Sequence, residues 1–523
     1  MPKYQRQDLL RELQETKKWD LIVIGGGATG LGIAVDGASR GYKTLLLEQL
    51  DFAKGTSSRS TKLVHGGVRY LAQGQVDLVT EALKERGRLL QNASHLVRIQ
   101  SFIIPNYRWW DNLFYNVGLK AYDLLAFRLS FGKSEKIDTD EVIERLPTIE
   151  TKELTGGVVY YDGQFDDSRL AINIAQSAID HGATVLNYFK VKNLLKDDSG
   201  VTIGVKTLDA ESEEEYDCYG SAIINATGVF TDEVLNMDEE EGTKMIQPSQ
   251  GIHLVLDKEF LPGNDAIMIP KTTDGRVLFL VPWQGKVLVG TTDTLVSEPS
   301  LEPKPLEEEI EFLLTTANQY LTKDVSRSDV LSMFAGLRPL SRPKDDKEST
   351  KEISRSHKII VSDSGLITIT GGKWTTYRRM AQDAIKKVIE LEKLPKKKCK
   401  TKELPIHGSG VKVENTLGLN RYGSDREKIE QMIADKPILG EKLHTSHPFL
   451  IAEVQWAVEQ EMARTIEDVL ARRVRLLFLD ARAALEVAPT VGEILAKELN
   501  REKDWVKKQL SEFQELANQY ILK

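Results

Sequence analysis

Seven side chains of this sequence stand in segments where they could act on a small anionic molecule: His65, Arg69, Tyr70, His253, Arg338, Arg355 and Lys373. Arg338 is the clearest case, because it follows the apolar, glycine-containing run Phe334-Ala335-Gly336-Leu337. A guanidinium in such surroundings needs an anionic partner, and phosphate or carboxylate groups pair with it through two parallel hydrogen bonds. For one arginine alone, an internal ion pair is the slightly preferred explanation. Three basic residues beside glycine turns favour an anionic substrate.

The N-terminal segment predicts the elements that would position such a site. An apolar run at residues 21–24 leads into the glycines Gly25, Gly27 and Gly30, and a second apolar run at residues 44–47 ends at Glu48. This order predicts a strand, a glycine turn, a helix and a second strand, which is the arrangement of a dinucleotide-binding unit. Gly25 would permit the turn, Gly27 the approach of a pyrophosphate, and Gly30 the close packing of helix on strand.

Several further residues are predicted to contact the dinucleotide. The pyrophosphate would lie at the N-terminus of the helix, at Ala28 and Thr29, where N–H groups and the helix dipole stabilise negative charge. Glu48 is placed to accept hydrogen bonds from a ribose. The small-residue loop after Glu48 is expected to wrap around the bound group, and with the residues after it supplies these candidates: Thr56, Ser57, Ser58, Lys62, Leu63, His65, Gly66 and Gly67.

The chain returns to small residues twice more. A short apolar strand is expected at residues 222–226 and closes on Thr227 and Gly228. A second strand, glycine turn and helix are expected from residue 366 to about residue 391, with Gly372, Lys373 and Thr375 in the turn. Repeated contact with glycine-rich turns far apart in sequence favours a flavin dinucleotide over a nicotinamide one.

Length and composition favour a multidomain globular protein. The chain has 523 residues, 41% of them hydrophobic, and predicts a leader helix at residues 1–18, an oxidoreductase domain at 19–400 and a helical domain at 404–523. Within the oxidoreductase domain, the cofactor-binding part is expected at about residues 19–100, 150–245 and 350–392. An antiparallel-sheet substrate part is expected at about residues 246–345. The fold class is therefore α/β with a C-terminal helical domain.

The charge, cysteine content and apolar runs of the sequence limit the kinds of partner and the compartment that fit it. The net charge of −8 disfavours nucleic acid. Cys218 and Cys399 form no metal-binding pattern, so no metal site is expected, and they fit a reducing compartment. No apolar run is long enough to span a bilayer, which leaves peripheral contact. The aromatic segment 102–131 is expected to be a helical hairpin packed into a core, with a lipid-facing surface as the alternative.

Five ordered segments together resemble the FAD-dependent, membrane-associated glycerol-3-phosphate dehydrogenases: residues 25–30, 56–71, 161–170, 335–340 and 371–378. The second of them includes Lys62-Leu63-Val64-His65-Gly66-Gly67-Val68-Arg69-Tyr70. The resemblance covers residues 18–400 closely and the helical tail more loosely. It implies an FAD-binding Rossmann-like fold of the D-amino-acid-oxidase type, and oxidation of sn-glycerol 3-phosphate to dihydroxyacetone phosphate, with electrons passed to membrane quinone.

The resemblance also implies residue roles. Arg338, Arg355 and Lys373 resemble ligands of the substrate and its phosphate, and Arg69 and Tyr70 resemble residues beside the flavin. His253 and His65 resemble histidines near the reactive centre. A histidine suits the role of proton acceptor because its unperturbed pKa is about 6.5. We expect His253 in this role and His65 as the alternative, although either could only hydrogen-bond the flavin or a carbonyl. Arg338 would stabilise the developing alkoxide.

Other assignments remain open in the sequence. A related oxidase that uses oxygen is an alternative, but the long substrate-region insertion usual in such oxidases is not seen here. Another FAD enzyme acting on a small hydroxy or amino substrate, or a non-catalytic flavin-fold module, is a further alternative. The resemblance implies a cytoplasmic protein held peripherally on the inner face of the cell membrane. A homodimer is one option for the oligomeric state.

Overall fold

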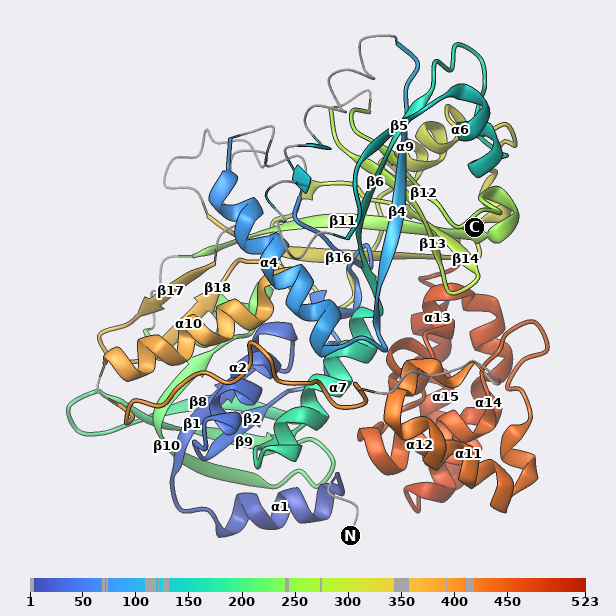
Figure 1. Cartoon of the computed structure of the whole chain (residues 1–523). Coiled ribbons are helices and arrows are strands. Elements are labelled where there is room, and N and C mark those ends of the chain that lie inside the picture. The colour runs from blue at the N-terminus through green and yellow to red at the C-terminus, as the bar shows by residue number, and fades with distance from the viewer. Residues whose placement is uncertain are drawn as a thin grey trace.

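Figure 1 shows the computed structural model of the chain, in which a first layer of strands and helices lies below a second sheet, and a group of C-terminal helices lies beside the first layer and beneath the second sheet. The structure describes residues 4–67, 71, 74–108, 119–120, 122–123, 125, 131–239, 244–272, 275–342, 357–391, 393–410 and 418–523.

The first sheet contains the expected dinucleotide-binding unit. Its parallel strands follow the order β18 (Ile367–Thr370), β10 (Glu215–Asn225), β1 (Trp19–Ile24), β2 (Thr44–Leu47) and β7 (Thr184–Leu186). The antiparallel strands β17 (Lys358–Val361), β9 (Thr202–Asp209) and β8 (Phe189–Lys196) complete it. Because the parallel strands point the same way, β1 and β10 both end at the edge where a cofactor would bind.

Helices cover this sheet and bury its apolar residues. They are α1 (Arg6–Glu15), α2 (Ala28–Ser39), α4 (Val76–Asn92), α7 (Asp167–Asp180), α8 (Thr231–Asp238) and α10 (Tyr377–Glu390). The helix α2 packs against both α7 and α10. The approach to α10 is close at Gly32, where an added Cβ would lie 2.8 Å from the ring of Tyr377. The helix expected to follow the second glycine turn and to end at about residue 391 is confirmed as α10.

The second sheet is antiparallel except where β4 pairs with β12. Its strands are β3 (Leu63–Val64), β4 (Val97–Pro105), β5 (Glu135–Ile137), β6 (Gly157–Phe165), β11 (Ile246–Asp257), β12 (Ala266–Ile269), β13 (Leu278–Trp283), β14 (Lys286–Gly290), β15 (Thr294–Leu295) and β16 (Ser332–Ser341). The helices α6 (Thr139–Arg145) and α9 (Glu307–Asn318) belong to the same half of the molecule. The antiparallel sheet expected within residues 246–345 is present in the pairing of β11–β16, and strands β3–β6 join it from earlier in the chain.

The expectation of a helical hairpin from residue 102 is wrong at its start. Phe102 lies in strand β4, fully buried, with its ring stacked on that of Tyr160 at 5.1 Å between centroids. The β-branched residues Ile99, Ile103 and Ile104 around it favour a strand, and the local aromatic content concealed that signal. Most of the remaining aromatic segment, including residues 109–118 and 126–130, lies outside the described residues.

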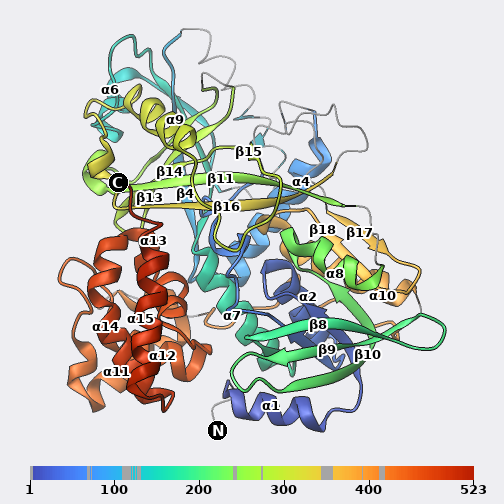
Figure 2. The ribbon, with the colours of Figure 1, turned by 180° about the vertical axis from the view of Figure 1, so that it is seen from behind.

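The C-terminal residues form the expected helical module. Its helices are α11 (Arg426–Asp435), α12 (Ile451–Glu461), the π-helix Asp468–Arg473, α13 (Leu476–Leu479), α14 (Ala481–Glu498) and α15 (Lys503–Ala517). Figure 2 shows α13 and α14 beneath β13 and β14, and their apolar side chains share one core with Trp283 and Phe334 of the second sheet. Among the helices that the structure describes, none has the length and apolar content to cross a membrane.

Candidate functional site

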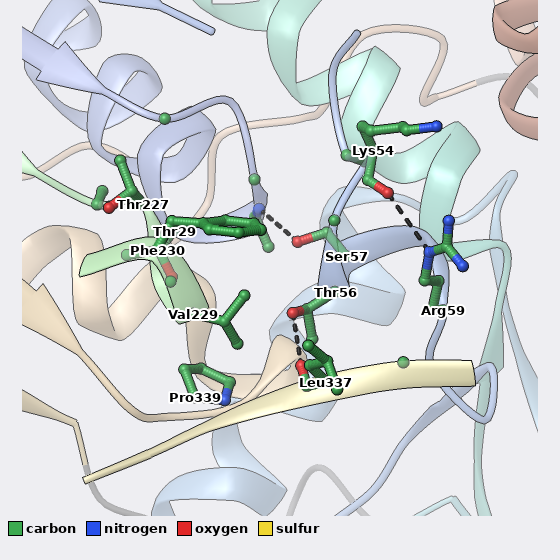
Figure 3. A pocket seen from close by; sticks show the side chains of 18 of the residues that line it. Thr29, Lys54, Thr56, Ser57, Arg59, Thr227, Val229, Phe230, Leu337 and Pro339 are labelled. Carbon is green, nitrogen blue, oxygen red and sulfur yellow. Dashed lines mark hydrogen bonds between the residues drawn. The ribbon is translucent and has the colours of Figure 1, made fainter. Parts of the chain in front are cut away.

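A cavity of about 380 Å³ opens where β1 and β10 end and face strand β16. Residues of segments far apart in sequence line it, among them 27–29, 53–57, 226–230, 336–340 and 371–375. Figure 3 shows Thr227, Val229 and Pro339 on one side of this cavity and Thr56 and Ser57 on the other. The structure therefore brings together the glycine-rich segments that the sequence had marked separately.

The glycine turn has the geometry that the sequence predicted. Gly25 has a φ of +108°, which favours glycine, and a Cβ there would lie 2.8 Å from the Ala226 carbonyl oxygen. A Cβ at Gly30 would lie only 1.9 Å from the carbonyl oxygen of Gly25, so α2 packs on the turn backbone. At the start of this helix, the Ala28 N–H donates to Ser57 Oγ at 2.9 Å.

Glu48 stands at the end of β2 and lines the same cavity. Its carboxylate accepts hydrogen bonds from the N–H groups of Gly26, at 2.6 Å, and Leu50, at 2.9 Å. Burial raises the pKa of Glu48, and these two hydrogen bonds oppose that rise. The backbone thus fixes the carboxylate beside the glycine turn, where a ribose hydroxyl can donate to it.

The loop after Glu48 and the residues that follow it are hydrogen-bonded to two other parts of the cavity wall, strand β16 and the 371–375 turn. Thr56 Oγ1 donates to the Leu337 carbonyl of β16 at 2.6 Å. Trp374 Nε1 donates to the Ser57 carbonyl at 2.8 Å. The His65 N–H donates to Thr375 Oγ1 at 3.2 Å. The loop therefore forms one wall of the cavity, as expected for a segment that wraps a bound group.

A second cavity of about 200 Å³ adjoins the first and shares part of its lining, including Thr61, Leu63, His65 and Arg338. Its other polar residues are Asp162, Arg276, Thr291, Thr292 and Asp293. The cavity thus holds two guanidinium groups, of Arg276 and Arg338, and two carboxylates, of Asp162 and Asp293. Arg276 was not predicted, although its position at the start of an apolar strand, directly after Gly275, is a signal that could have identified it.

Arg338 lies on β16 opposite Ser249 of β11, with its side chain 25% exposed toward the cavities. Its Nη1 lies 3.3 Å from Asp293 Oδ1, and its Nη2 donates to the Thr292 carbonyl at 3.1 Å. A Cβ at Gly251 would lie 2.4 Å from Nη2, so this glycine makes room for the guanidinium. Both explanations weighed for this arginine are present: an internal ion pair, and a charged group that faces a cavity.

His253 lies on β11, between Gly290 of β14 on one side and Phe334 of β16 on the other. Its ring stacks on that of Phe334 at 4.9 Å between centroids, and a Cβ at Gly290 would lie 2.3 Å from its Cδ2. Its Nε2 lies 2.9 Å from Thr61 Oγ1, in hydrogen-bond contact. Burial, with the charges of Lys62 and Arg338, lowers the pKa of His253 well below its ordinary value. The imidazole is therefore neutral at physiological pH.

Known proteins with similar sequences identify the family. Residues 20–378 match the family described as FAD dependent oxidoreductase, and residues 366–506 match the C-terminal domain of alpha-glycerophosphate oxidase. The chain is 41% identical over 525 residues to a probable mitochondrial glycerol-3-phosphate dehydrogenase of Caenorhabditis elegans, covering 94% of this chain and 72% of that protein. The chain belongs to the FAD-dependent glycerol-3-phosphate dehydrogenase family.

Two further members of this family support the same assignment. The mitochondrial glycerol-3-phosphate dehydrogenase of Schizosaccharomyces pombe is 38% identical over 562 residues, which cover 95% of this chain and 87% of that protein. The solved glycerol-3-phosphate dehydrogenase of Bacillus halodurans, complexed with FAD, superposes with a TM-score of 0.77 at 28% identity, covering 99% of this chain and 98% of that one. The D-amino-acid-oxidase-like fold and the FAD cofactor expected from the sequence are thereby confirmed.

The first cavity fits FAD by its own geometry. Gly27 carries no side chain beside Ser57, and the N-terminus of α2 faces the cavity, as pyrophosphate binding requires. Glu48 lines the same cavity, where its carboxylate could accept a hydrogen bond from a ribose hydroxyl. The flavin end then has the room between β16 and the 371–375 turn, next to the second cavity.

Most residues predicted for the cofactor line this cavity: Gly25, Gly27, Ala28, Thr29, Glu48, Thr56, Ser57, Leu63, His65, Thr227, Gly228, Gly372, Lys373 and Thr375. Gly67 lines only the second cavity. Ser58, Lys62 and Gly66 lie behind the lining. The Lys62 ammonium instead contacts Asp167 at 2.7 Å, and burial lowers its pKa to about 7 although Asp167 opposes the change.

Three predicted substrate residues, Arg69, Tyr70 and Arg355, lie outside the described residues. Apolar lining residues such as Val229, Phe230 and Pro339 were missed, because single apolar residues after a strand carry no recognisable pattern. Within the ranges that the structure describes, no cluster of three potential metal ligands occurs.

Proposed function

We propose that this chain oxidises sn-glycerol 3-phosphate to dihydroxyacetone phosphate. The observation that carries the proposal is the junction of the two cavities, where Arg338 and His65 line both and Arg276 stands in the smaller one. The relatives' names identify the same substrate. When bound, FAD takes the hydride that leaves C2 of the alcohol. The chain's residues must then hold the phosphate, accept the hydroxyl proton and exclude water.

Arg338 and Arg276 are the proposed phosphate ligands. A phosphate can replace part of the contact between Arg338 and Asp293, which is 3.3 Å long and leaves the guanidinium one-quarter exposed. Lys373, in the glycine turn that lines the first cavity, adds a third cation on the flavin side. Arg69, Tyr70 and Arg355 remain proposed substrate ligands on the resemblance alone.

His253 is the proposed proton acceptor. It is neutral, and its partner Thr61 lines both cavities, so the histidine is connected to the place where substrate and flavin meet. The charge of Arg338 contributes to the low pKa of His253. A bound phosphate would offset that charge and make the imidazole more basic when substrate is present. His65, which lines both cavities itself, is the alternative acceptor.

Anaerobic reduction of the bound flavin tests this function. The purified yellow protein should bleach on addition of glycerol 3-phosphate without air, and failure to bleach in FAD-loaded protein would disprove the proposal. His253→Asn should slow the reduction strongly, while a normal rate in this variant and a slow rate in His65→Asn would transfer the role to His65. Arg338→Ala should raise the substrate concentration needed for reduction and also slow the reduction itself.

We also propose quinone at a membrane surface as the electron acceptor, with the chain bound peripherally on the cytoplasmic face. The basic segment 396–402, which contains five lysines, supports attraction to anionic lipid, and the relatives' names as dehydrogenases support an acceptor other than oxygen. Turnover with a soluble quinone but not with oxygen is expected. Rapid hydrogen peroxide formation in air would favour the oxidase. Light scattering of the purified chain tests the proposed homodimer.

A further inference from the structure

The helical module contacts the FAD-binding half through charged residues that the proposed reaction does not use. Residues 51–60, here named the cofactor loop, form a wall of the first cavity. The π-helix Asp468–Arg473 and the residue Arg475 contact the outer side of this loop with their side chains. These contacts join segments more than 400 positions apart in the sequence.

Asp51 is the first anchor of the cofactor loop. It has no exposed surface, and its carboxylate receives Arg472 Nε at 2.5 Å and both terminal nitrogens of Arg473 at 2.9 Å. Despite its burial, these two guanidinium groups lower the pKa of Asp51 to about 2. A buried carboxylate of this kind depends on its partners, since removal of one leaves a charge without compensation.

The middle of the loop has a second anchor. Lys54 contacts the carboxylates of Glu467, in the helical module, and of Glu302. Glu467 also receives Arg472 Nη1 at 2.5 Å, so the same arginine binds Asp51 directly and Lys54 through this glutamate. Arg59 contacts Glu302 at 2.6 Å. The charges alternate from one segment to the next, which fixes the position of the loop against the module.

The end of the loop has a third anchor. Arg475 is fully buried, and its Nη2 donates to the Ser58 carbonyl at 2.8 Å and lies 3.2 Å from Asp167 Oδ1. Ser57, next to this carbonyl, accepts the hydrogen bond from the first N–H of α2. A movement of Ser58 would therefore move the side chain that stands at the predicted pyrophosphate position.

We propose that the helical module positions the cofactor loop for FAD, with Arg472, Arg473 and Arg475 as positioning residues. The inference rests on FAD as the cofactor but not on the identity of the substrate. It predicts that FAD affinity depends on charges that lie in the other module, behind the cavity wall. In this arrangement the module is a structural part of the cofactor site, and none of its described residues lines either cavity.

The test measures FAD binding by the full-length chain after removal and re-addition of FAD. Arg473→Met should weaken FAD binding about tenfold or more. The visible circular dichroism of the flavin should also change at saturating FAD, because the loop against it has moved. Arg464→Met is the matched control: the Arg464 side chain pairs with Glu211 at 2.5 Å and 2.6 Å across the interface between the helical module and the FAD-binding half, and it contacts neither the cofactor loop nor Arg473.

The control should keep its FAD affinity within about twofold of the wild type, even where its thermal stability falls as much as that of the Arg473 variant. Equal FAD affinity in Arg473→Met and the wild type would overturn the proposal, and so would an equal loss in both variants. If Arg473→Met does not fold, Arg473→Lys decides by the same two outcomes, since it keeps the charge and loses the paired contact with Asp51. FAD binding without glycerol 3-phosphate oxidation would count only against the proposed function.

Discussion

Gly30, in the first turn of α2, allows a prediction that runs against helix propensity. We expect Gly30→Ala to destabilise the chain and to weaken FAD binding, although alanine is the better helix former. In an open helix the substitution would add about 1 kcal/mol of stability. At this position the new Cβ would lie 1.9 Å from the Gly25 carbonyl oxygen, about 1.1 Å inside the 3.0 Å that real Cβ atoms respect.

The clash at Gly30 involves two backbone segments, so no change of side-chain rotamer can relieve it. Either α2 or the glycine turn must move, and overpacking of this kind costs about 1–3 kcal/mol. Gly25, whose carbonyl oxygen the new Cβ would meet, already has an unusual φ of +108°, so the turn has little freedom to move. We therefore place the cost at the upper end of this range. After subtraction of the gain in helix propensity, a net loss of about 2 kcal/mol is expected.

Denaturant unfolding of the FAD-free chain measures this loss, and FAD titration measures the effect on the site. Gly32→Ala in the same helix is the matched control, because its Cβ would meet only the ring of Tyr377 at 2.8 Å and side-chain atoms beyond it. A ring can tilt, so this variant should lose less stability and keep more FAD affinity. If Gly30→Ala proves as stable as the wild type with normal FAD affinity, close packing of α2 on the turn is not the reason for this glycine.

Two further predictions concern pH and the histidine on β11. Burial alone would lower the pKa of His407, but the hydrogen bonds that its ring donates to the carboxylates of Asp180 and Asp425 outweigh burial and raise the pKa to about 9. The contribution of protonated His407 to the free energy of unfolding, up to about 3 kcal/mol, should be complete below pH 6.5 and disappear as the pH rises to 9. Thermal melts should show this fall in stability with rising pH, and the fall should be smaller in His407→Gln. Gly290→Ala should displace the His253 ring, because the new Cβ would lie 2.3 Å from its Cδ2. The variant should reduce its flavin at least about tenfold more slowly under anaerobic conditions, with little change in FAD affinity. An unchanged rate would contradict His253 as the proton acceptor.

The dinucleotide-binding unit could be predicted because each of its requirements is local. An apolar run, a glycine turn and a helix of regular period can be recognised within about thirty residues. Gly25 and Gly30 do what their spacing indicated, and Glu48 stands at the end of β2 as expected. Thr56, Thr227 and Thr375 stand in small-residue turns that could be recognised locally, and the resemblance to a known family indicated that these turns meet at one cofactor.

The contacts with the helical module could not be predicted in this way. Asp51 and Arg473 are separated by 422 positions, and neither stands in a periodic or glycine-rich pattern. A single buried charge has no local signature, because its partner is chosen by the tertiary fold. The same reason explains Lys62: its place between two small-residue motifs suggested a cofactor ligand, whereas the fold directs its ammonium to Asp167.

One pair of strands explains why the proposed phosphate ligand and the proposed base act together. In the β11–β16 ladder, Ser249 faces Arg338, Gly251 faces Gly336, and His253 faces Phe334. Cross-strand partners share a face of the sheet, so the arginine and the histidine lie in one row with a glycine pair between them. Those glycines keep the row open, because a Cβ at Gly251 would lie against the Arg338 guanidinium and one at Gly336 against Arg59. The distance between the proposed phosphate ligand and the proposed base is therefore set by the backbone hydrogen bonds of this ladder, which hold positions more rigidly than a loop does.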